Sequence, residues 1–136
     1  MKKTVISLLF LLIVVATLPF VAHASTTQEK EIINFVSQKD KVTKAQCVVY
    51  ENNCVVAVKT EKFSTKTDYR QFKEKLVQQL TEKYNFENVF VTRSPKAMHA
   101  MDDIAKMDGT EREQCIQKMI EFYLKGKPYP PMIQPR

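Results

Sequence analysis

The segment Lys44–Lys59, KAQCVVYENNCVVAVK, constrains the fold more than any other part of the chain, because it predicts a β-hairpin. Its two apolar runs are rich in valine, which favours the pleated, half-buried surface of a strand. Between the runs, Asn52-Asn53 tolerates the positive φ that a tight hairpin turn requires. We therefore expect strands at about 43–50 and 54–61, joined by a turn at these two asparagines.

Periodic apolar residues predict helices on both sides of this hairpin. They recur at three- and four-residue spacing at about 28–39 and, more clearly, at about 67–83. Asn85 lets the chain turn after the second of these helices, and the alternating segment ENVFVT at 87–92 predicts a third strand. Ser94-Pro95 then starts another helix, with serine as the N-cap and proline at the first helical position.

The C-terminal part of the chain predicts one more helix and a tail. Thr110–Glu113 has the sequence of a capping box, and Gly126 is suited to end the helix that follows. Residues 127–136 are rich in proline and predict an extended, flexible tail. We therefore expect a single α+β domain at 25–126, with the order α-β-β-α-β followed by one or two C-terminal helices. The helices would cover one face of a small three-stranded sheet and leave the other face partly open.

The N-terminal segment at 1–24 predicts a secretory signal peptide. A positively charged start precedes the apolar run Val5–Leu18, and Ala22 and Ala24 form a small-x-small cleavage site before Ser25. The alternative is an uncleaved membrane anchor, because the apolar run is almost long enough to span a bilayer. The cleavage region contains no cysteine, so we expect an exported protein that is not lipid-anchored.

The charge of the chain argues against nucleic acid as a partner. Lysine and arginine total 21 against 15 acidic residues, which gives a net charge of +6. The basic residues are spread along the chain without a block of like charges, which is typical of a solvated surface. The chain also has only 2 glycines, which argues against a glycine-rich phosphate loop.

The chain that remains after signal cleavage keeps Cys47, Cys54 and Cys115, an odd number for an exported protein. A turn at Asn52-Asn53 would place Cys47 opposite Val58, with its sulfur roughly 13 Å from that of Cys54. A wider loop would place Cys47 opposite Cys54 and would permit a disulfide. The remaining alternatives are a bond to Cys115, a disulfide-linked multimer through a free thiol, and small buried side chains without any bond.

Candidate catalytic and metal-binding residues are few. A Cys–His nucleophile would need His99 beside a cysteine, and a surface position for this histidine is the simpler interpretation. No spacing typical of a metal site occurs, and Asp102 and Asp103, adjacent on a helix, would point in different directions. We therefore expect no enzyme activity, no metal and no cofactor.

The chain resembles the YhcN/YlaJ family of sporulation proteins in three segments. They are Lys41-Val42-Thr43 with Ala45–Val49, then Val55–Val58 after a short turn, and finally Asn88–Thr92 ahead of Pro95 and a helix. The resemblance implies an exported protein of a spore-forming bacterium, linked to the spore envelope or to germination, without an established catalytic activity. The chain lacks the lipobox cysteine of many members and the asparagine-rich spacer that often precedes their domain.

Three hypotheses follow from the sequence and this resemblance. The first is a non-enzymatic protein of the spore envelope or of the extracellular space, with unidentified envelope components as partners. The second is a binding module in which the open sheet face, with Lys59, Lys62 and Lys66, makes peripheral contact with anionic lipid or wall polymer. The third is a secreted thiol enzyme that uses Cys115 or Cys47 with His99, which would require a reactive thiol of low pKa.

Overall fold

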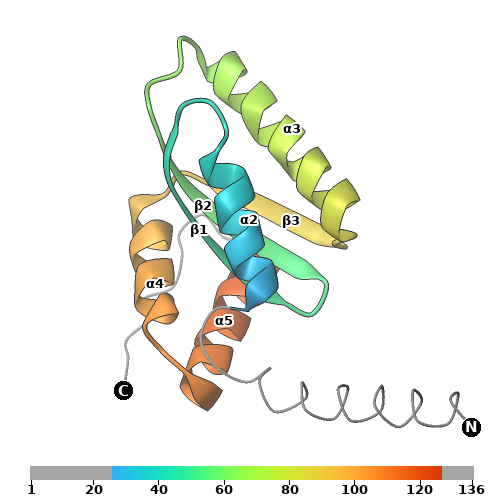
Figure 1. The fold of residues 1–136 in the computed structure, drawn as a ribbon, viewed down its shortest axis with the longest axis vertical. Helices are drawn as coiled ribbons and strands as arrows, with labels where there is room; N and C mark the ends of the chain where they lie inside the picture. The colour runs from blue at the N-terminus through green and yellow to red at the C-terminus, as the bar shows by residue number, and fades with distance from the viewer. Residues whose placement is uncertain (1–25, 127–136) are drawn as a thin grey trace, which may run out of the picture.

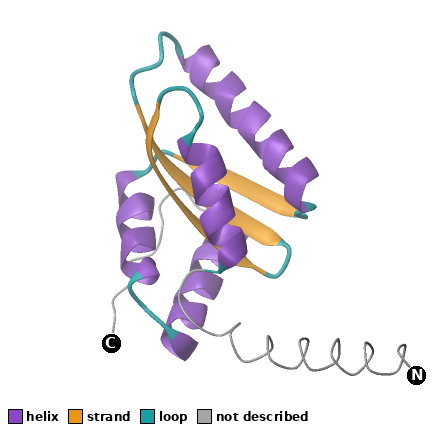
Figure 2. Ribbon diagram, in the orientation of Figure 1, coloured by secondary structure: helices purple, strands orange, loops and turns teal. Residues whose placement is uncertain are grey.

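A computed structural model describes residues 26–126 of the chain, and this part forms an α+β domain as the sequence predicts (Figures 1 and 2). In chain order its elements are α2 (Thr27–Ser37), β1 (Val42–Tyr50), β2 (Asn53–Thr60), α3 (Lys66–Tyr84), β3 (Asn88–Thr92), α4 (Pro95–Ala105) and α5 (Gly109–Leu124). The expected signal peptide at 1–24, its cleavage site at Ala22, Ala24 and Ser25, and the expected tail at 127–136 lie outside the described residues.

Within the described residues the strands form one sheet in the order β1-β2-β3. β1 and β2 are antiparallel, whereas β2 and β3 are parallel because α3 carries the chain back between them. β2 is therefore the central strand, and its run from Cys54 to Val58 is buried at every position. A strand that is paired on both sides and covered on both faces is expected to be apolar without interruption, as this one is.

Helices cover both faces of the sheet, which corrects the expectation of one open face (Figure 1). On the first face, Ile32 of α2 and Leu80 of α3 join the cluster that contains Val56. On the second face, Ile104 of α4 and Met119 of α5 join a separate cluster around the neighbouring positions of β2. Adjacent strand residues point to opposite faces, so the apolar run of β2 supplies both clusters. The C-terminal helices that the sequence predicts are the elements that close the second face.

Capping signals predict some of the helix boundaries correctly. Ser94 accepts a hydrogen bond from the Ala97 amide at 3.3 Å at the start of α4, and Asn85 ends α3 with a left-handed φ of 57°. The predicted capping box at Thr110 is wrong, because α5 already begins at Gly109, directly after an N-cap at Asp108 whose side chain makes no capping hydrogen bond. At the other end of α5, Gly126 has a φ of 68°, as its predicted role in ending the helix requires.

The hairpin turn lies one residue earlier than the sequence predicts. Tyr50 pairs with Asn53, so Glu51 and Asn52 form the turn, and Glu51 has the left-handed φ of 55°. Asn53 belongs to β2, where its side-chain oxygen accepts a hydrogen bond of 2.9 Å from the side-chain amide of Asn88 on β3. This contact with the third strand provides a physical reason for the position of Asn53 in the sheet, and a pattern confined to the hairpin does not reveal it.

Candidate functional site

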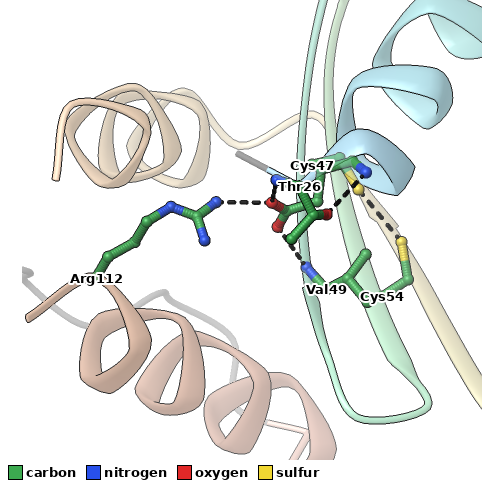
Figure 3. A network of polar contacts seen from close by, with 6 residues as sticks. Thr26, Cys47, Val49, Cys54 and Arg112 are labelled. Carbon is green, nitrogen blue, oxygen red and sulfur yellow. Dashed lines mark hydrogen bonds and ion pairs between the residues drawn. The ribbon is translucent and has the colours of Figure 1, made fainter. Parts of the chain in front are cut away.

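The most deeply buried charge among the described residues is the carboxylate of Glu29, which has no exposed surface. Its Oε1 atom accepts hydrogen bonds from the Thr26 amide at 2.9 Å and from Nη2 of Arg112 at 2.7 Å. Its Oε2 atom accepts a hydrogen bond from the Val49 amide at 2.9 Å. One carboxylate therefore connects the start of α2, the outer edge of β1 and the helix α5 (Figure 3).

The contacts of this network suit a role in stabilising the fold better than a role in catalysis. Within residues 26–126, two backbone amides and the guanidinium of Arg112 hold the carboxylate of Glu29 in place, and Arg112 is itself buried. The Nε atom of Arg112 is buried and has no hydrogen-bond partner among residues 26–126. Part of this network is visible in the sequence, because Thr26 and Glu29 form a capping box. The helix prediction at 28–39 overlooks it. The partner Arg112 lies 83 residues away along the chain and has no local signal.

Cys47 and Cys54 lie beside this network, and their sulfur atoms are 3.5 Å apart (Figure 3). Neither of the two registers expected from the sequence is present, because Cys47 pairs with Val56 and Cys54 pairs with Val49. The cysteines are diagonal neighbours on the face covered by α2 and α3. Both are free thiols in the structure.

Cys115 belongs to the other face of the sheet. It is a free, buried cysteine on α5, in the cluster formed with α4. The sheet therefore separates its thiol from the pair on the hairpin. Neither Cys47 nor Cys54 shares a core cluster with Cys115.

The surroundings of the thiols do not favour a nucleophile. The contact with Cys54, burial and the carboxylate of Glu29 all raise the pKa of the Cys47 thiol. Burial, assisted by Glu111, raises the pKa of the Cys115 thiol. A catalytic cysteine requires the opposite shift, toward the thiolate. The arrangement therefore counts against the thiol-enzyme hypothesis.

His99 lies on the surface of α4, as the simpler interpretation of the sequence predicts. Its side chain is 82% exposed, and its Nε2 atom is 3.6 Å from a carboxylate oxygen of Asp103. Cys47 and Cys54 lie on the opposite face of the sheet from α4, so neither can pair with this histidine. Asp102 makes different contacts from Asp103, as expected for adjacent residues of a helix.

A pocket of about 260 Å³ lies between α4 and the neighbouring end of the sheet. It is lined by basic side chains, by one carboxylate and by apolar atoms, namely Lys44, Lys59, Arg93, His99, Asp102, Val58, Pro95 and Met98. Nζ of Lys44 donates a hydrogen bond of 2.6 Å to Asp102, which also accepts one of 2.8 Å from Gln46. Burial alone would raise the pKa of Asp102, but the hydrogen bonds from Lys44 and Gln46 outweigh it and lower that pKa.

Aromatic rings extend this basic surface toward the start of α3. The guanidinium of Arg93 lies 3.5 Å from the ring centroid of Tyr69, and Nζ of Lys41 lies 5.2 Å from that of Phe63. The rings of Phe63 and Tyr69 are in edge contact, with centroids 5.5 Å apart. Stacking on aromatic faces leaves a guanidinium able to donate hydrogen bonds to an anion. We call Lys41, Lys59, Lys62 and Arg93, with these two rings, the basic end of the domain.

Two other kinds of site are not found in the described part of the chain. No group of three or more histidine, cysteine, aspartate or glutamate side chains among residues 26–126 could hold a metal ion. None of the helices within those residues is long and apolar enough to cross a membrane.

Comparison with known families identifies the domain. The family model described as sporulation lipoprotein YhcN/YlaJ matches residues 23–122, well over half of the chain. The chain belongs to the YhcN/YlaJ family of sporulation lipoproteins. The match covers all three segments on which the resemblance in sequence depends, and it gives the protein a role related to sporulation. A comparison with curated proteins found no match.

Membership of this family corrects the predicted localisation. The sequence predicts a protein that is not lipid-anchored, and the description of the family as lipoproteins contradicts that prediction. The prediction depended on the absence of a cysteine near Ala22 and Ala24. The absence of one residue type in a short segment is a weaker criterion than a family match over 23–122.

Proposed function

We propose that this YhcN/YlaJ protein is an exported, non-enzymatic component of the spore that contributes to envelope assembly or to germination. The observation that carries the proposal is the family match over residues 23–122. The buried thiols of Cys47 and Cys115, both with raised pKa, support a role without nucleophilic catalysis. In this proposal the domain acts through its surface and binds envelope components.

The test compares where the protein accumulates with what its loss changes. An immunoblot of vegetative cells, culture medium and purified spores should give signal in the spore fraction. Spores of a strain that lacks the protein should show altered germination kinetics or altered resistance, and the intact sequence should restore both. Protein found mainly in the medium of growing cells, together with unchanged spores, would contradict the proposal.

A second candidate function is the binding of anionic lipid or wall polymer at the basic end. The specific observation is the pocket in which Lys44, Lys59 and Arg93 converge beside the start of α4. Lys44 is paired with Asp102, whereas no salt bridge within residues 26–126 involves Lys59 or Arg93. This candidate replaces the open sheet face of the sequence hypothesis, since α4 and α5 cover that face. Binding should weaken as the salt concentration rises, because added ions screen such contacts.

A further inference from the structure

The hairpin brings two thiols together in a way that its sequence alone leaves open. Cys47 and Cys54 are separated along the chain by a two-residue turn and parts of two strands, yet their sulfur atoms are 3.5 Å apart. They are 4% and 0% exposed, so the pair lies under α2 and α3 and away from solvent. A disulfide requires about 2.05 Å between the sulfur atoms, so the two sulfurs must still approach each other. Because diagonal neighbours on paired strands have Cα atoms roughly 7–8 Å apart, closing the bond also requires a local adjustment of the two strands.

The third cysteine is placed where it cannot compete for either member of the pair. Cys115 lies in the core cluster on the opposite face of the sheet, and it is 8% exposed. A bond from Cys115 to the hairpin would have to pass through the central strand. Its burial also leaves little sulfur surface for a bond to a second chain.

We propose that Cys47 and Cys54 form an intramolecular disulfide across the β1–β2 hairpin and that Cys115 stays a free thiol. The proposal selects one of the pairings that the sequence leaves open. It rests on the proposed export of the protein in one respect only, because disulfides persist in oxidising compartments.

The chemistry requires an external oxidant of the disulfide class, such as a thiol–disulfide oxidoreductase in its oxidised form. One cysteine thiolate attacks the oxidant's disulfide and forms a mixed disulfide, and one thiol of the oxidant leaves. The second cysteine then attacks the mixed disulfide and releases the other thiol. The two cysteines lose two protons and two electrons, and the oxidant's disulfide becomes two thiols. Because both sulfurs are buried in the folded domain, the bond forms before α2 and α3 cover this face.

The test uses the full chain isolated from cells or spores after an acid quench, which stops thiol exchange. Free thiols are labelled with iodoacetamide in denaturant, and the protein is then digested with trypsin. Cleavage after Lys44 and Lys59 gives one peptide with both Cys47 and Cys54, whereas Cys115 lies alone in the peptide at 113–118. Each peptide therefore reports on one half of the proposal in a single mass spectrum.

The proposal predicts an unlabelled peptide at 45–59, lighter by two hydrogen atoms than its thiol form, and a labelled peptide at 113–118. Reduction before labelling should add two labels to the first peptide. Two labels on 45–59 without reduction would overturn the proposal, as would a cross-link between 45–59 and 113–118. The labelling is applied to whichever fraction contains the protein. Its outcome is therefore independent of the experiment that tests the spore function.

A thermal measurement provides an independent readout. Closing the loop between Cys47 and Cys54 restricts the unfolded chain, so reductant should lower the Tm of the isolated protein by about 5 °C or more. In the variant Cys54→Ala, reductant should leave the Tm unchanged. In the matched variant Cys115→Ala, the decrease should persist. A Tm of the unsubstituted protein that does not respond to reductant would contradict the proposal.

Discussion

Glu29 and Arg112 form a 2.7 Å ion pair between α2 and α5, which pack on opposite faces of the sheet. The side chain of Glu29 is fully buried and that of Arg112 is 11% exposed. The pair passes the edge of β1, where Glu29 also accepts a hydrogen bond from the Val49 amide. The first and last helices of the described domain are therefore joined by one buried carboxylate.

We predict that Glu29→Gln destabilises the domain by about 3 kcal/mol, because a buried guanidinium loses its ionised partner. The amide oxygen of glutamine can still accept hydrogen bonds, but its amide nitrogen would face an N–H donor on either side, so the loss combines the ion pair with at least one hydrogen bond. Urea unfolding at neutral pH measures the change. Glu31→Gln is the matched control, since Glu31 is exposed on the same helix. Equal stability of the two variants would show that the pair with Arg112 does not stabilise the domain.

A second prediction concerns α4 and α5, the helices that cover the face of the sheet expected from the sequence to be partly open. Met119 of α5 has no exposed surface and lies in the cluster with α4. Met119→Ala should lower the free energy of unfolding by about 2–5 kcal/mol, because it opens a cavity in a packed core. Leu80→Ala, in the core of the other face, should have an effect of similar size.

The control for these cavities is Leu124→Ala at the end of α5, where the leucine is 48% exposed. It should lower the free energy of unfolding by less than about 1 kcal/mol, because the substitution removes little buried apolar surface. If Met119→Ala were as mild as this control, the second face would be open in solution and the earlier expectation from the sequence would be restored.

The elements themselves were predictable because their signals are local. The valine runs of the hairpin, the N-cap at Ser94 and the left-handed Asn85 each lie within a few residues of the structure that they determine. The exact turn was not predictable in this way. It depends on Asn53, which contacts Asn88 on a strand that is distant in sequence.

Long-range contacts explain the remaining differences. Apolar residues at three- and four-residue spacing show that α4 and α5 have apolar faces. The spacing does not show which face of the sheet these helices cover. In the same way, no local pattern pairs Glu29 with Arg112 or joins Lys44 to Asp102. The pocket at the basic end consists of residues from β1, β2 and α4, with Arg93 from the connection between β3 and α4, so it exists only once the sheet and that helix have packed together.

Asp102 should make the stability of the domain depend on pH in the acid range. Because hydrogen bonds from Lys44 and Gln46 lower its pKa below the ordinary value of 3.8, its contribution is complete above that value. The contribution is then lost as the pH falls through the lower pKa of the folded state. The effect should stay below about 1 kcal/mol, because both Asp102 and Lys44 are partly exposed.

Urea unfolding of the unsubstituted protein and of Asp102→Asn, repeated from neutral pH to about pH 2, measures this contribution. The difference in stability between the two proteins should be largest near neutral pH and should shrink in acid. Asp108→Asn is the control at an exposed position that makes no capping hydrogen bond. A difference for Asp102→Asn that stays constant down to the lowest pH would contradict the assigned hydrogen bonds.

The last prediction tests the basic end as a binding surface. Lys59 and Lys62 are exposed, and the double variant Lys59→Gln/Lys62→Gln removes two positive charges without disturbing the stack of Arg93 on Tyr69. Because each basic residue near an anionic surface contributes about 1 kcal/mol, affinity for vesicles that contain anionic lipid should fall about 10-fold or more. Vesicle co-sedimentation at low salt measures this change, and isolated wall polymer is assayed in parallel to separate the two possible ligands.

The matched control is Lys118→Gln/Lys125→Gln, which removes the same charge from exposed positions on and just after α5. If binding depends on the local arrangement at the basic end, this control should retain most of its affinity, although the net charge of the two variants is equal. Added salt should weaken binding of the unsubstituted protein, because screening acts on exposed charges. Equal losses in both double variants would instead indicate a general effect of net charge, and binding that salt does not change would exclude the basic end as an electrostatic site.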